Sequence, residues 1–153
     1  EAAKQVVEFL PLDEFLKQSD IISCHMPYIK GQNENFINEE FISKMKDHAI
    51  LVNTARGEVL DLEAAVKAIE NNKLDGLAID VISNEKSLFF KNFENGKMDT
   101  PLHQKLIDLY PRILITPHVA SSTDKALNDM IEVSLQNMDE YLNTGKCKNS
   151  LIK

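Results

Sequence analysis

Four polar clusters hold the side chains that could do chemistry, and each cluster directly follows a short apolar run. The clusters are His25, residues 53–57, residues 80–85 and His118. If the apolar runs are neighbouring parallel strands, the clusters converge, because open sheets bind ligands beyond the carboxyl ends of their strands. The sequence therefore predicts one crevice lined by all four.

Arg56 is a candidate for binding an anionic substrate. It stands in Asn53-Thr54-Ala55-Arg56-Gly57, past an apolar run and before a glycine that lets backbone approach closely. The planar guanidinium group suits two-point capture of a carboxylate. An ordinary solvated arginine on a loop is an equally open interpretation.

His118 is a candidate acid and base. It follows Ile115-Thr116-Pro117, and imidazole is the usual proton donor or acceptor at neutral pH. Glu85 could be its partner, since a carboxylate on one ring nitrogen fixes the tautomer and favours the protonated ring. The sequence does not show that the two meet, and a surface role for Glu85 stays open. His48 and His103 are predicted to be structural.

Asp80 interrupts an apolar run over residues 77–82. A carboxylate at such a place is costly unless it has a partner. It could cap a neighbouring helix, or it could accept hydrogen bonds from the amide of a ligand. The sequence leaves both interpretations open.

The elements that must position these side chains are short apolar strands alternating with amphipathic helices. We predict strands over residues 6–10, 21–24, 49–52, 77–81 and 113–116, with the third buried on both faces. We predict helices over residues 12–18, 39–45, 62–70 and 123–142, with caps at Asn38 and Asp61. A polar insertion fills 84–110. This alternation predicts an α/β fold with a mostly parallel sheet and helices on both faces.

The composition narrows the function classes. With 17 Lys and Arg against 24 Asp and Glu, the formal charge is −7, which disfavours partners such as nucleic acid or anionic lipid. The apolar runs are shorter than the ~20 residues of a membrane helix. No signal peptide is visible. Cys24 and Cys147 lie far apart, so we expect no disulfide, no metal site and a reducing cytoplasm.

Several motifs together resemble the D-isomer-specific 2-hydroxyacid dehydrogenases, in order and over nearly the whole chain. The segment Ser19-Asp20-Ile21-Ile22-Ser23-Cys24-His25-Met26-Pro27 resembles one signature, and Lys44-Met45-Lys46 through Val52-Asn53-Thr54-Ala55-Arg56-Gly57 to Asp61 another. Thr116-Pro117-His118 matches a third. Asp80-Val81, then Glu85, then Leu88-Phe89-Phe90 resembles the D-lactate and D-2-hydroxyisocaproate dehydrogenase branch.

The resemblance implies a role for each catalytic candidate. Arg56 would bind the substrate carboxylate and help to polarise the C2 carbonyl group. His118 would exchange a proton with the C2 oxygen, and Glu85 would keep His118 protonated. The reaction implied is the interconversion of a 2-oxo acid and a D-2-hydroxy acid, D-lactate or a larger analogue, with NAD as cofactor.

The resemblance also implies the cofactor site and the domains. Asp80 would hold the nicotinamide carboxamide, and further residues would line the cofactor side: His25, Pro27, Asn53 and Thr54. Residues 1–121 would be the C-terminal part of a doubly wound, Rossmann-type NAD-binding domain. Residues 122–153 would be a helix and tail that return to the substrate domain. A homodimer is expected.

Two departures from the branch concern the substrate pocket. Ile82-Ser83 follow Asp80-Val81 where the branch usually has Tyr-Glu. Residues 119–122 are Val-Ala-Ser-Ser where it usually shows a small and then an aromatic residue. A wall built from serine admits a larger 2-oxo acid than an aromatic wall does.

The phosphate-binding loop G-x-G-x-x-G does not occur among the five glycines. We therefore expect a C-terminal fragment of an oxidoreductase, which by itself binds NAD weakly or not at all because nothing cradles the pyrophosphate. The alternative is a non-catalytic nucleotide-sensing or protein-binding module of the same ancestry.

Overall fold

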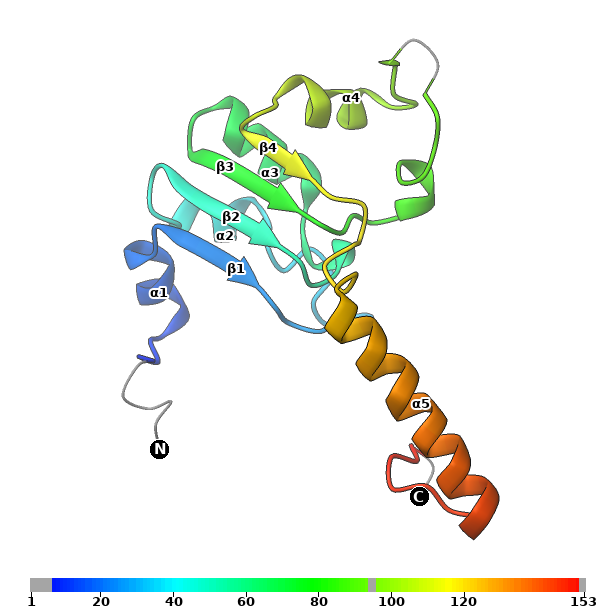
Figure 1. Cartoon of the computed structure of the whole chain (residues 1–153). Helices are drawn as coiled ribbons and strands as arrows, with labels where there is room; N and C mark the ends of the chain where they lie inside the picture. Colours follow the sequence, from blue (N-terminus) through cyan, green and yellow to red (C-terminus); the bar gives the residue numbers. More distant parts are fainter. Residues whose placement is uncertain (1–6, 94–95, 152–153) are drawn as a thin grey trace. The chain divides into compact units, whose positions relative to one another are not determined.

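The computed structural model describes residues 7–93 and 96–151, and its contacts divide the chain into two units, before and after the bond between His118 and Val119 (Figure 1). Among these described residues, the first unit carries four strands, four α-helices and two short 3-10 helices. The second carries one long α-helix. In chain order the elements are α1 (Leu12–Gln18), β1 (Ile21–Cys24), α2 (Glu39–Lys44), β2 (Ala49–Asn53), η2 (Gly57–Val59), α3 (Leu62–Glu70), β3 (Leu74–Ile79), η3 (Glu85–Ser87), α4 (Pro101–Asp108), β4 (Ile113–Ile115) and α5 (Asp124–Thr144).

The four strands form one parallel sheet in the order β1-β2-β3-β4. Its register aligns Ile22, Leu51, Leu77 and Ile113 in one row, and all four are buried. Helices α1 to α4 contact one another in sequence, and α3 and α4 contact the sheet. The predicted α/β class and parallel sheet are confirmed, and every strand ends at the same edge (Figure 1).

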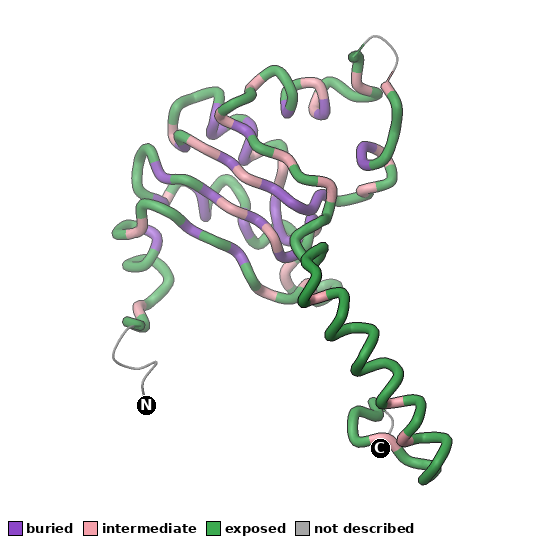
Figure 2. The backbone as a smooth tube through the Cα atoms, in the orientation of Figure 1, coloured by how far each residue is buried: buried purple, intermediate pink, exposed green. Residues whose placement is uncertain are grey.

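Within the described residues, the helices cover one face of this sheet, so the predicted helices on the other face are not formed by this part of the chain. On the opposite face Ile21, Ile50 and Leu114 are exposed. Along β1, exposed and buried residues alternate (Figure 2). The prediction that residues 49–52 are buried on both faces is wrong, because Ile50 is 38% exposed. An apolar run in a strand indicates that both faces can be buried, and it does not specify what covers each face.

Local capping signals place most helices where the sequence predicts them. The side chains of Asn38 and Asp61 accept the backbone N–H groups of Phe41 and Ala64, each three residues on. Thr123 does the same at the start of α5. These bonds satisfy amide groups that a first helical turn leaves without partners. The predicted helix starts are therefore confirmed.

Three predicted elements need correction. The strand predicted over 6–10 is not formed in residues 7–10, where no strand of the described chain pairs with it, while residue 6 lies outside the described part. The strand β3 spans Leu74–Ile79, so it begins three residues and ends two residues before the predicted strand. The polar insertion contains the helix α4, capped by Thr100 and started by Pro101.

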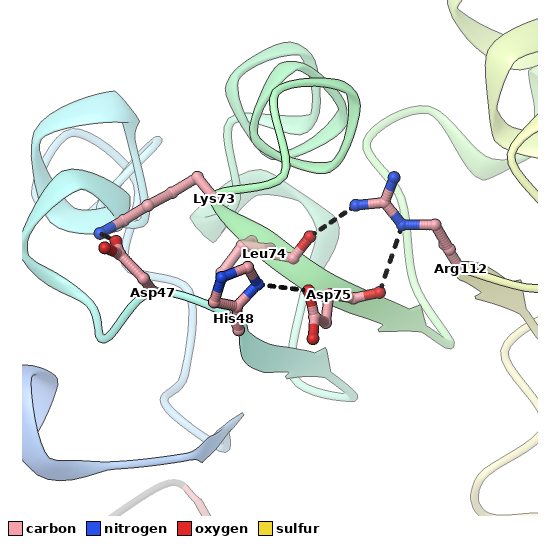
Figure 3. A network of polar contacts seen from close by, with 6 residues as sticks. All are labelled: Asp47, His48, Lys73, Leu74, Asp75 and Arg112. Carbon is pink, nitrogen blue, oxygen red and sulfur yellow. Dashed lines mark hydrogen bonds and ion pairs between the residues drawn. The ribbon is translucent and has the colours of Figure 1, made fainter.

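A polar network joins the loops at the amino ends of the strands, away from the predicted site (Figure 3). Lys73 Nζ donates to Asp47 and to the Met45 carbonyl oxygen at 2.6 and 2.7 Å, and this ion pair lowers the pKa of Asp47. His48 Nδ1 lies 2.9 Å from Asp75. His48 therefore has the structural position that the sequence predicts.

The second unit is the single helix α5 with a short tail. None of the α5 side chains is buried, and the exposed large apolar ones include Leu127, Met130, Ile131, Val133, Leu135, Met138, Tyr141 and Leu142. Gly145 ends the helix with a φ of +66°. In the described part of the chain, no helix combines the length and apolar character that crossing a membrane requires. The assignment of this unit to a substrate domain stays a prediction.

Candidate active site at the carboxyl edge of the sheet

His118 and Glu85 form a hydrogen-bonded pair beyond the carboxyl ends of β3 and β4. His118 Nδ1 lies 2.9 Å from Oε1 and 3.0 Å from Oε2 of Glu85. The two side chains are 41% and 34% exposed, so the pair is open to a ligand. The sequence did not show whether the two side chains are in contact, and the structure brings them together although they are 33 residues apart in the chain. The Nδ1 atom is engaged with Glu85, which makes Nε2 the nitrogen that can face a substrate.

The backbone at His118 is held in an unusual conformation. Its φ is +53°, in the left-handed region that costs a non-glycine residue about 1–3 kcal/mol. Its N–H donates to the carbonyl oxygen of Asp80 at 2.8 Å and to that of Thr116 at 3.0 Å. These bonds offset the strain, so the position of the imidazole is determined by the end of β3 as well as by its own loop.

Arg56 stands between two hollows at the same edge. One, of about 370 Å³, is lined by Arg56, Gly57, Ile82 and Glu85 among others. The other, of about 390 Å³, is lined by Arg56 and by the predicted cofactor residues His25, Pro27 and Thr54. Arg56 is exposed, and its Nη1 donates to the Ala55 carbonyl oxygen at 2.6 Å. The guanidinium group is therefore accessible from both hollows.

Asn53 organises the turn that presents Arg56. It is completely buried at the end of β2, where its Nδ2 donates to the Arg56 carbonyl oxygen at 3.0 Å and its Oδ1 accepts the Ala55 N–H at 3.1 Å. The side chain thus binds its own loop. The cofactor role that the resemblance implies for Asn53 stays a prediction beside this structural one.

Gly57 allows the Arg56 loop to touch the segment that leads to Glu85. A Cβ atom on Gly57 would lie 2.0 Å from the Ile82 carbonyl carbon and 2.2 Å from the Ser83 nitrogen. Only glycine fits against backbone at that distance. This contact places Arg56 and Glu85 on the wall of the same hollow.

Replacing Gly57 by Ala is expected to lower the free energy of unfolding by at least about 1–3 kcal/mol, since the added methyl group displaces backbone. The measurement is the urea midpoint of the full-length protein. The matched control is Gly76→Ala, where the nearest atom lies at an ordinary 3.5 Å. Equal midpoints for the two variants would contradict the close approach.

Asp80 is buried at the end of β3, with 4% of its surface exposed. Its carboxylate accepts a hydrogen bond from the Thr116 hydroxyl group, and its N–H donates to the Asn53 carbonyl oxygen at 3.0 Å. Sequence reasoning did not single out Thr116. The register of the two strands could have identified it. Ile79 pairs with Ile115, and Asp80 and Thr116 are the residues that directly follow this pair.

The loop after β1 carries the remaining predicted residues, His25 and Pro27, which are both exposed. His25 Nε2 lies 2.8 Å from the Ser23 hydroxyl group. Asn33, also missed by sequence reasoning, donates from Nδ2 to the Pro27 carbonyl oxygen at 2.8 Å and accepts the Ile29 N–H at 2.7 Å. Its amide therefore holds the loop that lines the second hollow.

Tyr28 lines the same hollow and donates its hydroxyl proton to Glu34. That hydrogen bond is the main reason that the pKa of Tyr28 rises to about 12, with burial and nearby carboxylates adding to it. The phenol stays neutral at working pH. Tyr28 therefore adds a neutral aromatic wall beside Arg56.

The residues at this edge fit the nicotinamide end of NAD. A buried carboxylate can accept hydrogen bonds from a carboxamide, and Asn53 links the Asp80 backbone to the loop that carries Arg56. The G-x-G-x-x-G loop that would hold the pyrophosphate does not occur in this sequence. Among the described residues, no group of three or more His, Cys, Asp or Glu side chains could hold a metal ion.

Comparisons with known proteins indicate the same family that the sequence motifs resemble. Residues 1–120 match the family described as D-isomer specific 2-hydroxyacid dehydrogenase, NAD binding domain. An aromatic 2-oxoacid reductase of Clostridium sporogenes (strain ATCC 15579) is 36% identical over 152 residues, covering 99% of this chain and 45% of that protein.

Two solved structures have the same fold. A D-lactate dehydrogenase from Sporolactobacillus has a TM-score of 0.90 at 30% identity, over 99% of this chain and 45% of that one. The D-lactate dehydrogenase of Aquifex aeolicus, complexed with NAD and lactic acid, has a TM-score of 0.79 at 39% identity, over 94% of this chain and 43% of that one. This chain thus spans less than half the length of these relatives. It belongs to the D-isomer specific 2-hydroxyacid dehydrogenase family and matches the family's NAD-binding domain.

Proposed function

We propose that the full-length protein carrying this chain reduces a 2-oxo acid to the D-2-hydroxy acid with NADH, and catalyses the reverse oxidation. The observation that carries the proposal is the contact between His118 and Glu85 on the edge of the sheet where Arg56 is exposed. A carboxylate-binding arginine beside a protonated imidazole is what the reduction of a 2-oxo acid needs.

In the proposed reaction, the side chains bind, orient and move one proton. The Arg56 guanidinium group binds the substrate carboxylate through two parallel hydrogen bonds. Nε2 of His118 donates its proton to the C2 oxygen as that oxygen gains negative charge. Glu85 holds Nδ1 and stabilises the charged ring until the proton leaves. NADH, when bound, supplies the hydride that reaches C2.

The Aquifex relative has NAD and lactic acid bound, and the Clostridium relative is named for aromatic 2-oxo acids. Both substrate classes are open to this chain. The serines at 121 and 122 favour the larger class. No observation favours the non-catalytic module.

The test is NADH oxidation by the full-length protein with pyruvate, 4-methyl-2-oxopentanoate and phenylpyruvate, followed by chiral analysis of the product. We expect D-2-hydroxy acids, with a higher kcat/KM for the two larger substrates than for pyruvate. L-products, or no turnover with any of the three, would refute the proposal. Faster turnover of pyruvate would refute only the choice of substrate.

Replacing Glu85 by Gln is expected to lower kcat for the reduction roughly 10-fold or more, which is the usual effect of weakening a hydrogen bond to a charged group. The neutral amide can still lie near Nδ1 of His118, but it no longer stabilises the charged ring that donates the proton. The measurement is kcat and KM for the 2-oxo acid. Glu63→Gln, an exposed carboxylate on α3, is the control. A kcat of Glu85→Gln equal to that of the control would mean that the two residues are not coupled in catalysis.

We also propose that the full-length protein is a homodimer in a reducing compartment such as the cytoplasm. Exposed apolar side chains along α5 and on one sheet face support an association, and two free cysteines support the compartment. Light scattering of the eluted full-length protein tests the dimer, and a monomer at micromolar concentration would exclude it.

A further inference from the structure

We infer that Thr116 is a positioning residue for the cofactor. Its hydroxyl group orients the Asp80 carboxylate, and the oriented carboxylate accepts a hydrogen bond from the N–H of the nicotinamide carboxamide. The inference rests on the proposed function, and it adds a residue to which neither the family resemblance nor the comparisons give a role.

The first support is the burial of Asp80. A carboxylate with 4% exposure has little water to satisfy it, so its orientation depends on protein donors. The Thr116 hydroxyl group is a donor to one of its oxygens. A hydrogen bond to an ionised acceptor is among the stronger ones, and it restricts rotation of the carboxylate plane.

The second support is the way in which Thr116 is itself held. Its N–H donates to the Ile79 carbonyl oxygen at 3.0 Å, which continues the ladder between β3 and β4 and places Thr116 beside Asp80. A β-branched side chain has few χ1 rotamers, so a fixed backbone also aims the hydroxyl group. The donor is thus preorganised before any ligand binds.

The third support is the link from this pair to His118. The carbonyl oxygens of Asp80 and Thr116 both accept the His118 N–H. The same two residues therefore hold the proposed acid by their backbones and the carboxylate by a side-chain contact. A shift in one is transmitted to the other over a few hydrogen bonds, which keeps the hydride donor and the proton donor aligned with each other.

The experiment compares NADH with its reduced 3-acetylpyridine analogue, whose methyl ketone has no N–H to donate. Binding of each to the full-length protein is measured by calorimetric titration for the wild type, Thr116→Val and Thr116→Ser. Valine keeps the branched shape and removes the donor, whereas serine keeps the donor. Thr116 is exposed, so these changes remove little packing.

We expect Thr116→Val to weaken NADH binding roughly 10-fold or more, which is the usual effect of a lost hydrogen bond to a charged group. Binding of the analogue should change less than about twofold, because it makes no bond to Asp80 that could be lost. Thr116→Ser should retain most of the NADH affinity. Thr116→Ala is a second variant without the donor. If the valine protein does not fold, we expect the alanine protein to show the same larger loss of affinity for NADH than for the analogue.

Equal losses for NADH and the analogue would show that Thr116 only supports the fold, and they would overturn the inference. So would unchanged NADH binding in Thr116→Val. Wild-type protein that binds NADH but reduces no 2-oxo acid would refute the proposed function and leave this test valid. Wild-type protein that binds neither cofactor would refute both.

Discussion

Replacing His118 by Asn is expected to lower kcat for reduction by roughly 10²–10⁴, which is the usual contribution of a positioned general acid. KM for the 2-oxo acid should change far less, because Arg56 makes the proposed contact to the carboxylate. Asn is chosen so that the loss of the imidazole is not combined with a change in backbone strain. Asn tolerates the left-handed conformation that His118 adopts at a φ of +53°, so the loop is expected to keep its shape.

The measurement is steady-state reduction by the full-length protein, together with its thermal midpoint. His48→Asn is the matched control, since His48 also has a positive φ and also contacts a carboxylate, at the other end of the sheet. We expect that control to retain kcat. A His118→Asn protein with kcat within about threefold of wild type would remove His118 from the reaction, because a general acid contributes far more than that.

Replacing Arg56 by Gln is expected to lower kcat/KM for the 2-oxo acid on the order of 10² or more, through loss of the two-point contact with the carboxylate. Most of the effect should appear in KM, with a smaller one in kcat if Arg56 also polarises the C2 carbonyl group. Arg56→Lys should fall between the two, because an ammonium group keeps the charge but cannot match the planar fork.

A second substrate makes the Arg56 experiment specific. The primary amide of the same 2-oxo acid carries no charge, so the wild-type protein should reduce it poorly and Arg56→Gln should lose little further activity. Loss in the same proportion for acid and amide would mean that Arg56 acts on the fold of its loop. The Asn53 contacts to that loop do not involve the guanidinium group, which is the reason to expect the loop to persist.

Much of the site was predictable because its parts follow strands. His25, Asn53, Asp80 and His118 each come at or just after the carboxyl end of a strand that the apolar runs already indicate. The carboxyl ends of parallel strands share an edge, so their convergence follows from topology. The helix α4 was not predicted, since its few apolar positions lie within a long polar insertion and its cap, Thr100, is a weak signal without them.

The sequence does not show which face of each strand is covered by another element. An apolar strand residue such as Ile50 indicates that burial is favourable, but the covering element is distant in the chain and its docking depends on summed packing. The segment 7–10 has strand-like composition and no neighbouring strand in the described chain, and an extended segment gains its hydrogen bonds only from a neighbour.

The sequence by itself determined the helix caps, the order of the four paired strands along the chain, and the identity of the polar residues at the sheet edge. These depend on contacts within three or four positions, such as the Asn38 oxygen that accepts the Phe41 N–H. Only the tertiary structure decided which of those residues touch. Glu85 reaches His118 across 33 positions, and Thr116 reaches Asp80 across 36. Those contacts follow from the register of β3 against β4, which is set by packing over the whole sheet.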